Sequence, residues 1–533
     1  MNREKGWLRC LLGFLILSFC IALVVNFSFI SSTAAASPQY GGTFGTHTSE
    51  PRSLDPHVEV IENVYMVTGN IYNGLLRLNQ DMTGVECDLA ESWKRVDNVT
   101  YIFKLRKNVH FHNIPPANGR EVTSSDVKYS IERLAGQHGK KVDFVHRYYY
   151  EDKLASIDLP DDYTIVFKTK KPYAPFINYI ASTRSVIVPK EAVEEYKDLR
   201  RNAIGTGPFI LEEIVRGSHI ILSKNPNYFK KGLPYLDKIH IQIMGDPTSI
   251  VASFLAGKLD SIGSQFFQIK LLKEKAPDTI IVEQKGTHMW VLRCPSEIKD
   301  EKPLELPFNN LKVRQAIAMS IDKERLLKLA LGGAGTVQIG PIPNWPPYSL
   351  SEKDQVEYNP EKAKRLLAEA GYPDGFTTEL TTWNADYMIR PAQVIQAMLK
   401  EVGINVDLKI MEMAQYFGLG KTFGYNMSFH VTSAGVDPDE YITPYFGSPE
   451  QAQYFRWIRP DVWKMCSEEA EELNIEKRIN LIQKIQKEVI SDGRWVCLYT
   501  QTRYAAMKPY VHRTFYKNEY QPLMGETVWM EKH

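Results

Sequence analysis

Histidines and carboxylates are the side chains of this 533-residue sequence that could do chemistry, so their spacing is considered first. His110 and His112 alternate along an extended segment, which would place both rings on one face. A zinc or nickel site needs further protein ligands, and the sequence supplies no third ligand next to this pair. The acidic residues are scattered, and one sequence does not show which of them would pair. We therefore predict no metal site and no cofactor.

The motifs of familiar catalytic sites are absent from the sequence. It contains no G-x-S-x-G, no H-E-x-x-H, no Walker loop and no dinucleotide fingerprint. Gly205 and Gly207 permit a tight backbone, but no Gly-Lys-Ser/Thr follows them, so this segment is not a phosphate loop. We predict that the protein is not an enzyme. A hydrolase is the enzyme-class alternative, and it would require turnover of a bound peptide or glycoside.

The first 36 residues have the pattern of an export signal. Three basic residues within 3–9 precede an apolar run over 10–30, and small residues then lead to Ala36. This pattern predicts a secretory signal peptide that is cleaved after Ala36. The alternative is an uncleaved membrane anchor, because about twenty apolar residues span a bilayer. Cys20 would suggest a lipoprotein, but Phe19 stands where lipidation needs a small residue, so a free periplasmic protein is favoured.

Charge and cysteine content narrow the class of protein. The net charge is +1, and removal of 1–36 takes away three basic residues and one acidic residue, which leaves −1. This balance argues against a nucleic-acid binder, which normally has a strong basic excess. The remaining chain is long enough for two or three domains. Its cysteines show no metal spacing, and both disulfide pairing and free thiols stay open. They are Cys87, Cys294, Cys466 and Cys497.

Periodicity predicts an α/β protein. Residues 101–105 and 163–167 alternate as strands, and Ser124 or Ser125 can cap the helix that begins there. Strand 379–383, helix 392–402 and strand 404–410 form a β-α-β unit, which packs parallel strands under a helix. Further helices are predicted over 359–371 and 479–489, and a strand over 495–499.

The stretch 306–327 predicts two successive helices. Asn309 or Asn310 can cap the first helix, and Asp322 can cap the second, because short polar side chains satisfy free N–H groups at a helix start. The pair Gly332-Gly333 would end the second helix.

This stretch, together with several shorter motifs, resembles the family-5 (dipeptide/oligopeptide/nickel-type) solute-binding proteins of ABC importers. The resemblance covers essentially the whole chain after residue 36. The motifs that carry it are PFNNLKVRQAIAMSIDKERLL at 307–327, GTGPF at 205–209, LAESW at 89–93, IYNGLL at 71–76 and NPNYF at 225–229.

The resemblance implies a periplasmic-binding-protein-like Venus flytrap of the large cluster C type, with two α/β lobes and an extra domain. Lobe I is expected to comprise 37–60, 195–288 and 496–533, the extra domain 61–194, and lobe II 289–495 after a signal peptide of 1–36. The implied function is capture of a peptide-like or other small solute between the lobes. The implied partners are an inner-membrane ABC permease and its ATPase, and the protein is expected to be a monomer.

The resemblance also implies where the solute binds. In peptide-binding relatives a Trp-x-x-Asp-x-x-Asp-Pro run supplies a carboxylate for the peptide amine. Here Val431 replaces the Trp and Ala434 replaces that Asp, while Asp437-Pro438 is kept. We therefore expect Ala434 to disfavour free-amine peptides, with Glu50 a candidate substitute. Asp437 is included in the site, although capping its loop is its favoured role. The full candidate set is Glu50, Trp290, Trp383, Met413, Thr432, Ser433, Ala434 and Asp437.

Two other interpretations stay open beside the hydrolase. One is a membrane-anchored sensor, motivated by the long apolar run at 10–30. The other is a nickel-chelate or haem binder on the same fold, motivated by the histidines. These are His47, His110, His112, His288 and His430.

Overall fold

The computed structural model describes residues 37–58, 62–138, 146–294, 298–299, 302–303, 307–343, 345–422, 426–432, 435–448, 459–516 and 525–532. Residues Tyr40–His533 form one compact unit, to which all of the following refers. In the described part of this unit, no helix has both the length and the apolar character that a membrane crossing requires.

The N-terminal strand lies in a sheet with the order β1-β10-β9-β8. β1 runs parallel to β10, and the other neighbours are antiparallel. The bounds are β1 (Thr43–Thr48), β8 (Phe209–Val215), β9 (His219–Lys224) and β10 (Lys238–Ile243), followed by α6 (Pro247–Leu255) and α7 (Phe266–Lys275).

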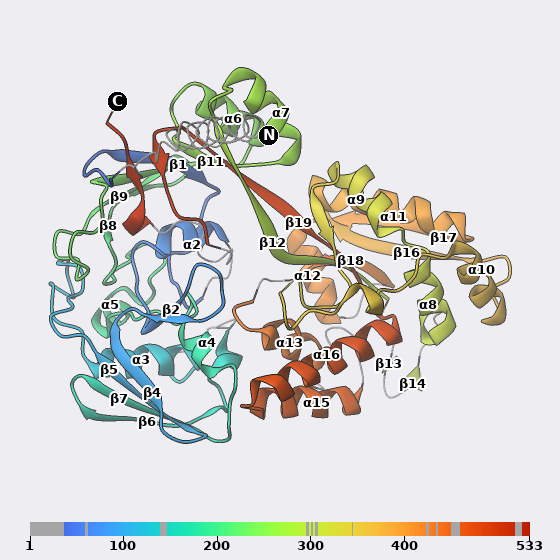
Figure 1. Ribbon diagram of the computed structural model, residues 1–533, viewed down its shortest axis with the longest axis horizontal. Coiled ribbons are helices and arrows are strands. Elements are labelled where there is room, and N and C mark those ends of the chain that lie inside the picture. The colour runs from blue at the N-terminus through green and yellow to red at the C-terminus, as the bar shows by residue number, and fades with distance from the viewer. Residues whose placement is uncertain are drawn as a thin grey trace, which may run out of the picture. The chain divides into compact units, whose positions relative to one another are not determined.

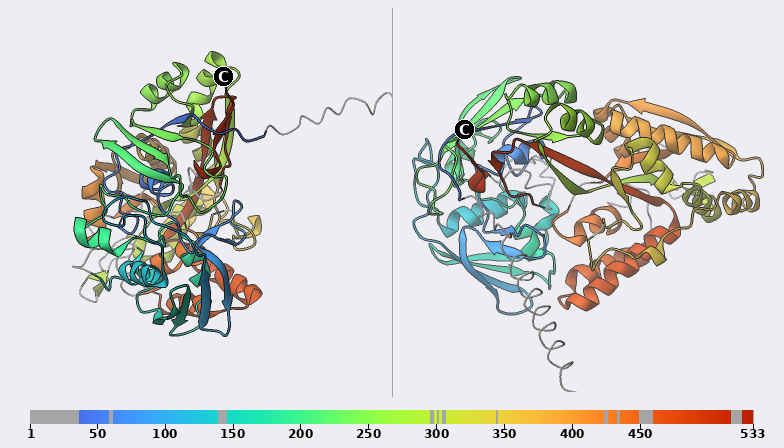
Figure 2. Two further views of the ribbon diagram at one scale, coloured as in Figure 1. Left: turned by 90° about the vertical axis from the view of Figure 1, so that its left-hand side faces the viewer. Right: turned by 45° about the horizontal axis from the view of Figure 1, so that its top comes forward.

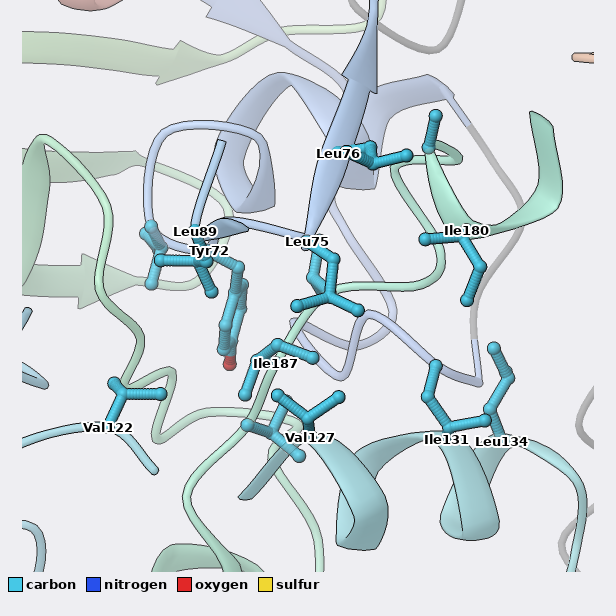
Figure 3. Close-up of a cluster of buried hydrophobic side chains, with 14 of the residues drawn as sticks. Tyr72, Leu75, Leu76, Leu89, Val122, Val127, Ile131, Leu134, Ile180 and Ile187 are labelled. Atoms are coloured by element: carbon cyan, nitrogen blue, oxygen red, sulfur yellow. The ribbon is translucent and has the colours of Figure 1, made fainter. Parts of the chain in front are cut away.

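A second, antiparallel sheet has the order β4-β5-β7-β6. Its helix α3 (Ser124–Leu134) turns Val127, Ile131 and Leu134 toward the segments that carry Leu75 and Ile187 (Figure 3). This apolar core is continuous with that of the first sheet, because both contribute to one cluster of buried side chains. The bounds are β4 (Ala90–Arg95), β5 (Thr100–Leu105), β6 (Leu154–Asp161) and β7 (Thr164–Thr169), with α2 (Glu62–Thr68), β2 (Leu76–Leu78), β3 (Val85–Cys87), η1 (Arg147–Tyr149), α4 (Phe176–Ile180) and α5 (Lys190–Tyr196) around them.

The third sheet is built on two long antiparallel strands and has the order β11-β19-β12-β18-β16-β17. β16 runs parallel to both β17 and β18. The long pair extends from the side of α6 and α7 to the β16–β18 end (Figure 1). Its register is interrupted by a bulge between Lys285 and Met289. The bounds are β11 (Ser261–Ser264), β12 (Ile280–Arg293), β15 (Gly335–Val337), β16 (Phe376–Trp383), β17 (Ile404–Met411), β18 (Met427–Val431) and β19 (Trp495–Met507).

Helices cover both faces of the β16–β18 end of this sheet. Trp290 and Leu292 of β12 join the core under α8, α9 and α11, while Met289 and Val291 join the core under α13, α15 and α16. α11 and α16 thus lie on opposite faces (Figure 2). The bounds are α8 (Leu311–Met319), α9 (Lys323–Leu331), α10 (Pro360–Glu369), α11 (Asp386–Glu401), α12 (Met413–Thr422), α13 (Thr443–Phe446), α15 (Pro460–Glu471) and α16 (Ile475–Asp492). Short elements are β13 (Ile298–Lys299), β14 (Lys302–Pro303), η2 (Pro307–Asn309), η3 (Glu352–Asp354), η4 (Pro438–Tyr441), β20 (Val511–His512), η5 (Gly525–Thr527) and β21 (Trp529–Met530).

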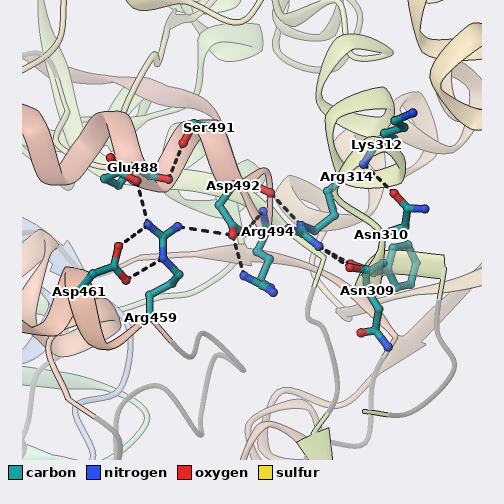
Figure 4. A network of polar contacts seen from close by, with 11 residues as sticks. Asn309, Asn310, Lys312, Arg314, Arg459, Asp461, Glu488, Ser491, Asp492 and Arg494 are labelled. Atoms are coloured by element: carbon teal, nitrogen blue, oxygen red, sulfur yellow. Dashed lines mark hydrogen bonds and ion pairs between the residues drawn. The ribbon is translucent and has the colours of Figure 1, made fainter. Parts of the chain in front are cut away.

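The two helices predicted over 306–327 are confirmed as α8 and α9. The Asn310 side chain accepts from the N–H of Lys312 at 2.9 Å, and Asp322 caps α9 in the same way. Gly332 ends α9 in the left-handed conformation, as predicted. From α8, Arg314 donates to the main-chain carbonyl of Asp492 at 2.7 Å, which ties this hairpin to the end of α16 (Figure 4).

The structure corrects several element boundaries. The residue that caps α3 is Thr123, one position before the predicted serines, because Asp126 accepts from the Thr123 N–H in a capping box. α11 begins at Asp386, not at 392, and Pro391 lies inside it. β19 continues to Met507, beyond the predicted end at 499. Strands that were not predicted include β4, β6, β8, β9, β12 and β18.

Candidate functional site

The candidate site lies where parallel strands of the third sheet end. β16, β17 and β18 end at Trp383, Met411 and Val431, and in open α/β sheets ligands bind outside such carboxyl ends. Trp383 pairs with Met411, and Trp290 of β12 pairs with Val431. This edge therefore brings together Trp290, Trp383 and the segments that lead into Met413 and Thr432.

Aromatic rings gather at this edge. α12 follows β17 almost directly and carries Tyr416 and Phe417 back over the end of the sheet. The Trp383 ring lies 4.9 Å from that of Tyr416, 5.7 Å from that of Phe417 and 6.0 Å from that of His430. Tyr387 completes the group at 6.5 Å from Trp383. We call these five residues the aromatic cluster.

A buried arginine anchors the inner side of the aromatic cluster. Arg293 donates to the Ser428 hydroxyl and to the Tyr416 hydroxyl, both at 2.9 Å. The Tyr416 hydroxyl is also 3.1 Å from Nδ1 of His430. Burial, reinforced by the Arg293 guanidinium, holds the pKa of His430 well below its ordinary value. The imidazole is therefore neutral at physiological pH.

The outer side of the aromatic cluster is open to solvent. Phe417 and Tyr387 are 49% and 42% exposed, and Met413 at the start of α12 is 43% exposed. Trp383, at 2%, forms the covered floor. Binding sites for small molecules combine apolar and aromatic walls with a few fixed polar groups, and this edge offers both.

Two further polar atoms lie beside this edge on the long strand pair. The rings of Trp290 and Tyr499 stack with centroids 5.3 Å apart and an interplanar angle of 11°. Both side chains are buried, and among the described residues neither the indole N–H nor the phenol hydroxyl has a hydrogen-bond partner. Burial raises the pKa of Tyr499 well above its ordinary value, so its hydroxyl keeps its proton.

The segment after β18 contains four of the predicted residues. Thr432 prolongs the sheet, because its N–H donates to the carbonyl of Met289 at 2.9 Å and its hydroxyl accepts from the Met289 N–H at 3.3 Å. Ser433 and Ala434 lie outside the described residues. Asp437 is fully buried and accepts from Arg478 at 2.5 Å and from Asn178 at 2.8 Å. Its oxygens are thus engaged by protein donors.

Glu50 lies elsewhere in the described structure. Its carboxylate accepts from the N–H of Gly217 at 2.7 Å and is 3.7 Å from Arg216, both in the turn between β8 and β9. None of the contacts that the described residues make joins it to the aromatic cluster. Trp290, Trp383, Met413 and Thr432 are therefore brought together, and Glu50 is not among them.

The histidines of the metal interpretation are dispersed over the described chain. The ring of His110 bonds to the carbonyl of Gly119, and that of His112 bonds to the carbonyl of Gly207. His47 accepts from the N–H of Gly263. In the part of the chain that the structure describes, no three His, Cys, Asp or Glu side chains are grouped so as to hold a metal ion. The four cysteines named above are free thiols.

The residues that sequence reasoning missed are Arg293, Tyr387, Tyr416, Phe417 and Tyr499. The signal that could have pointed to α12 is its position, because it directly follows a predicted strand of the β-α-β unit. Arg293 carried no local signal, since its partners are 123 and 135 residues away in the sequence.

Comparisons with known proteins find similar sequences that cover most of the chain. A family model described as bacterial extracellular solute-binding proteins, family 5, middle, matches residues 84–453. The glutathione-binding protein GsiB of Pectobacterium atrosepticum is 27% identical over 463 residues, which cover 84% of this chain and 86% of that protein. Heme-binding protein A of Haemophilus influenzae is 27% identical over 481 residues and 83% of each chain.

Solved structures are similar over nearly the full length. The periplasmic binding protein DppA from Helicobacter pylori, in complex with the peptide STSA, has a TM-score of 0.77 at 25% identity and covers 93% of this chain and 99% of its own. AgaA from A. tumefacien R10, in complex with agropinic acid, has a TM-score of 0.78 at 25% identity and covers 92% and 99%.

Proposed function

The chain belongs to the bacterial extracellular solute-binding proteins of family 5, and on this premise we propose that it captures a small, peptide-like solute at the aromatic cluster. Proteins of this family bind peptides or related solutes for ABC importers. The family, the α/β flytrap fold and the transport function predicted from the sequence are thereby confirmed.

One observation supports this location above all. The aromatic cluster ends a set of parallel strands, is fixed from beneath by Arg293 and is open at Phe417 and Tyr387. Such a surface suits a solute that has an apolar or ring-bearing part next to hydrogen-bonding groups.

The proposed mechanism is closure around the solute. A solute that binds the closed form better than the open form shifts the population toward closure, and no covalent step is needed. We propose that the solute leaves unchanged, that the protein acts as a monomer with the lobe and domain bounds predicted above, and that an inner-membrane permease with its ATPase receives the solute. The proposed location is the periplasm, after cleavage at Ala36. N-terminal sequencing of exported protein should then begin at Ser37, whereas an intact N-terminus would favour the membrane-anchored sensor.

Calorimetry with the mature protein tests this function. The panel comprises glutathione, haem, agropinic acid and the peptide Ser-Thr-Ser-Ala, because relatives or structural neighbours are named for these compounds. We expect saturable binding of at least one compound, a smaller radius of gyration in solution scattering, and recovery of that compound intact. Binding without compaction would refute closure, and recovery of cleaved compound would favour the hydrolase.

A further inference from the structure

Three neighbouring acids link the segment after β18 to a distant part of the chain. Asp437 accepts from Asn178 at 2.8 Å, Asp439 accepts from the Tyr179 hydroxyl at 2.6 Å, and Glu440 accepts from Arg184 at 2.7 Å. The donors come from the predicted extra domain and the acceptors from predicted lobe II. These hydrogen bonds therefore join two parts that a flytrap would move relative to each other.

The two carboxylate oxygens of Glu440 accept hydrogen bonds from different parts of the chain. One carboxylate oxygen accepts from Arg184 and, at 2.6 Å, from the Tyr149 hydroxyl. The other oxygen accepts from the main-chain N–H of Val436 at 2.7 Å. A single carboxylate thus bridges the Arg184 guanidinium and the main-chain N–H of Val436, which lies five residues beyond the end of β18.

The backbone next to Val436 has little freedom to adopt another arrangement. The Gly435 N–H donates to the Tyr441 hydroxyl at 2.9 Å, and that hydroxyl donates to the carbonyl of Thr287 at 3.2 Å, within the bulge of β12. A Cβ atom on Gly435 would lie 2.8 Å from both Glu440 and Tyr441, so only glycine fits. The conformation of Gly435 and Val436 is therefore set by Glu440 and Tyr441.

The Arg184–Glu440 ion pair is buried, so it forms only while the segment 149–184 packs against the segment 437–440. Arg184 is 1% exposed and Glu440 is 6% exposed. The guanidinium also donates to the Tyr149 and Tyr65 hydroxyls, at 2.6 Å and 3.1 Å. Removal of one partner from a buried ion pair leaves the other charge without compensation in a poorly solvating environment. Separation of the segments would instead let water solvate both groups, so the pair distinguishes the joined state from the separated state.

We propose that Arg184 is a positioning residue for solute binding, which holds the Gly435–Val436 backbone through Glu440 while residues 149–184 pack on 437–440. This role in solute binding rests on the proposed function, because Gly435 and Val436 follow β18, the strand that ends at the aromatic cluster. Arg184 itself need not touch the solute.

Amide hydrogen exchange of the protein without added solute tests the positioning directly. Arg184→Gln should speed exchange at Val436 by about 10-fold or more. A local opening there costs less free energy once Arg184 no longer holds Glu440, which accepts from the Val436 N–H. Arg133→Gln is the matched control, since Arg133 is likewise buried, at 4% exposed, and its guanidinium pairs with another acid, Asp55, at 2.6 Å. It should lower the unfolding midpoint but leave exchange at Val436 unchanged.

Conservative variants separate positioning from general damage. Tyr149→Phe removes one hydrogen bond to Glu440 and should give an intermediate rate even if Arg184→Gln fails to fold. Arg184→Lys keeps the charge and should partly restore the slow exchange. The double variant R184Q/E440Q should exchange at Val436 no faster than E440Q alone. Both changes disrupt the same pair of hydrogen bonds, from Arg184 to Glu440 and from Val436 to Glu440.

Native mass spectrometry supplies the link to solute binding. Protein from the source cells should lose its retained solute in the Arg184→Gln form and keep it in the Arg133→Gln form. Unchanged exchange at Val436 in Arg184→Gln and Tyr149→Phe would overturn the positioning role. A wild-type protein that carries no solute and binds no panel compound would instead count against the proposed function, whatever the exchange rates are.

Discussion

Trp383 and His430 stand side by side at the ends of β16 and β18, with ring centroids 6.0 Å apart and ring planes at 78°. The two residues are brought together because the strands are parallel and Leu380 pairs with Met427, so that three positions later Trp383 falls beside His430. The neutral imidazole and the indole form the floor over which Phe417 and Tyr387 remain exposed. This floor is the place where we expect the solute to bind.

Phe417→Ala should weaken solute binding by about 10-fold, because a half-exposed aromatic side chain buries apolar area and ring contacts worth roughly 1–2 kcal/mol on a bound partner. Stability should change little, since Phe417 is 49% exposed in the free protein. Calorimetry with the panel compound that binds the wild type measures the first effect, and urea unfolding measures the second.

Phe267→Ala is the matched control for Phe417→Ala. Phe267 is 58% exposed on α7, a helix outside the aromatic cluster. Its removal should leave affinity unchanged. Equal affinities for the wild type and both variants would place the solute away from the aromatic cluster.

Local signals explain how much of the fold was predictable from sequence. The caps Asn310 and Asp322 act on N–H groups two and three residues away, so the sequence alone located α8 and α9. The strands of the β-α-β unit were recognised by their alternation. The start of α11 was misplaced by six residues, because proline is normally unfavourable inside a helix and this helix extends through Pro391. β12 was missed because its pattern mixes one exposed half with one half that is buried on both faces.

The candidate site was less predictable, for a physical reason. Trp383 stood at the end of an identifiable strand, but Tyr416 and Phe417 lie in a glycine-containing helix without a clear apolar face. Arg184 and Glu440 are 256 residues apart, and only tertiary packing joins them. Local sequence patterns located strands β16 and β17, which end at the candidate site. The residues that contact one another there could be identified only from the structure.

Arg314→Met should lower the free energy of unfolding by about 2–4 kcal/mol, because it leaves the buried carbonyls of Asp492 and Phe308 without their donor, at roughly 1–3 kcal/mol for each. Arg314 and Asp492 are both nearly buried, and Arg314 also holds the carbonyl of Phe308 at 2.8 Å (Figure 4). Urea unfolding measures this loss. Lys312→Met, which breaks a pair with Glu369 at the surface, should cost less than about 1 kcal/mol. Similar losses in the two variants would show that Arg314 does not anchor the hairpin.

Glu526 should make stability depend on acid pH. Burial opposes ionisation of this carboxyl, but Lys230 and Arg77 outweigh it and lower the pKa of Glu526 to about 2. Because this folded-state pKa lies below the ordinary value of 4.5, the contribution is complete above pH 4.5 and is lost as the pH falls toward 2. The shift corresponds to stability on the order of 3 kcal/mol.

Glu526→Gln tests that contribution. Unfolding free energies of wild type and variant should differ most above pH 4.5 and converge as the pH falls from 4.5 toward 2. A difference that stays constant from pH 7 to pH 3 would contradict the assignment to ionised Glu526.

Ala434→Asp should create a partner for a free peptide amine. A charge-assisted hydrogen bond contributes roughly 1.5–3 kcal/mol, so we expect the affinity for unblocked Ala-Ala to rise by about 10-fold or more relative to its N-acetylated form. Calorimetry with both dipeptides measures this preference. Ala434→Asn, which has nearly the same shape and no charge, should show no such preference. Tight binding of unblocked Ala-Ala by the wild type would refute the expectation that Ala434 disfavours free amines.

The most direct test of solute binding is native mass spectrometry of the protein purified from its source cells. We predict a mass that exceeds that of the chain beginning at Ser37 by one small solute, and loss of this excess on denaturation and in Phe417→Ala. The bare mass of the chain, unchanged after incubation with each panel compound, would contradict the account.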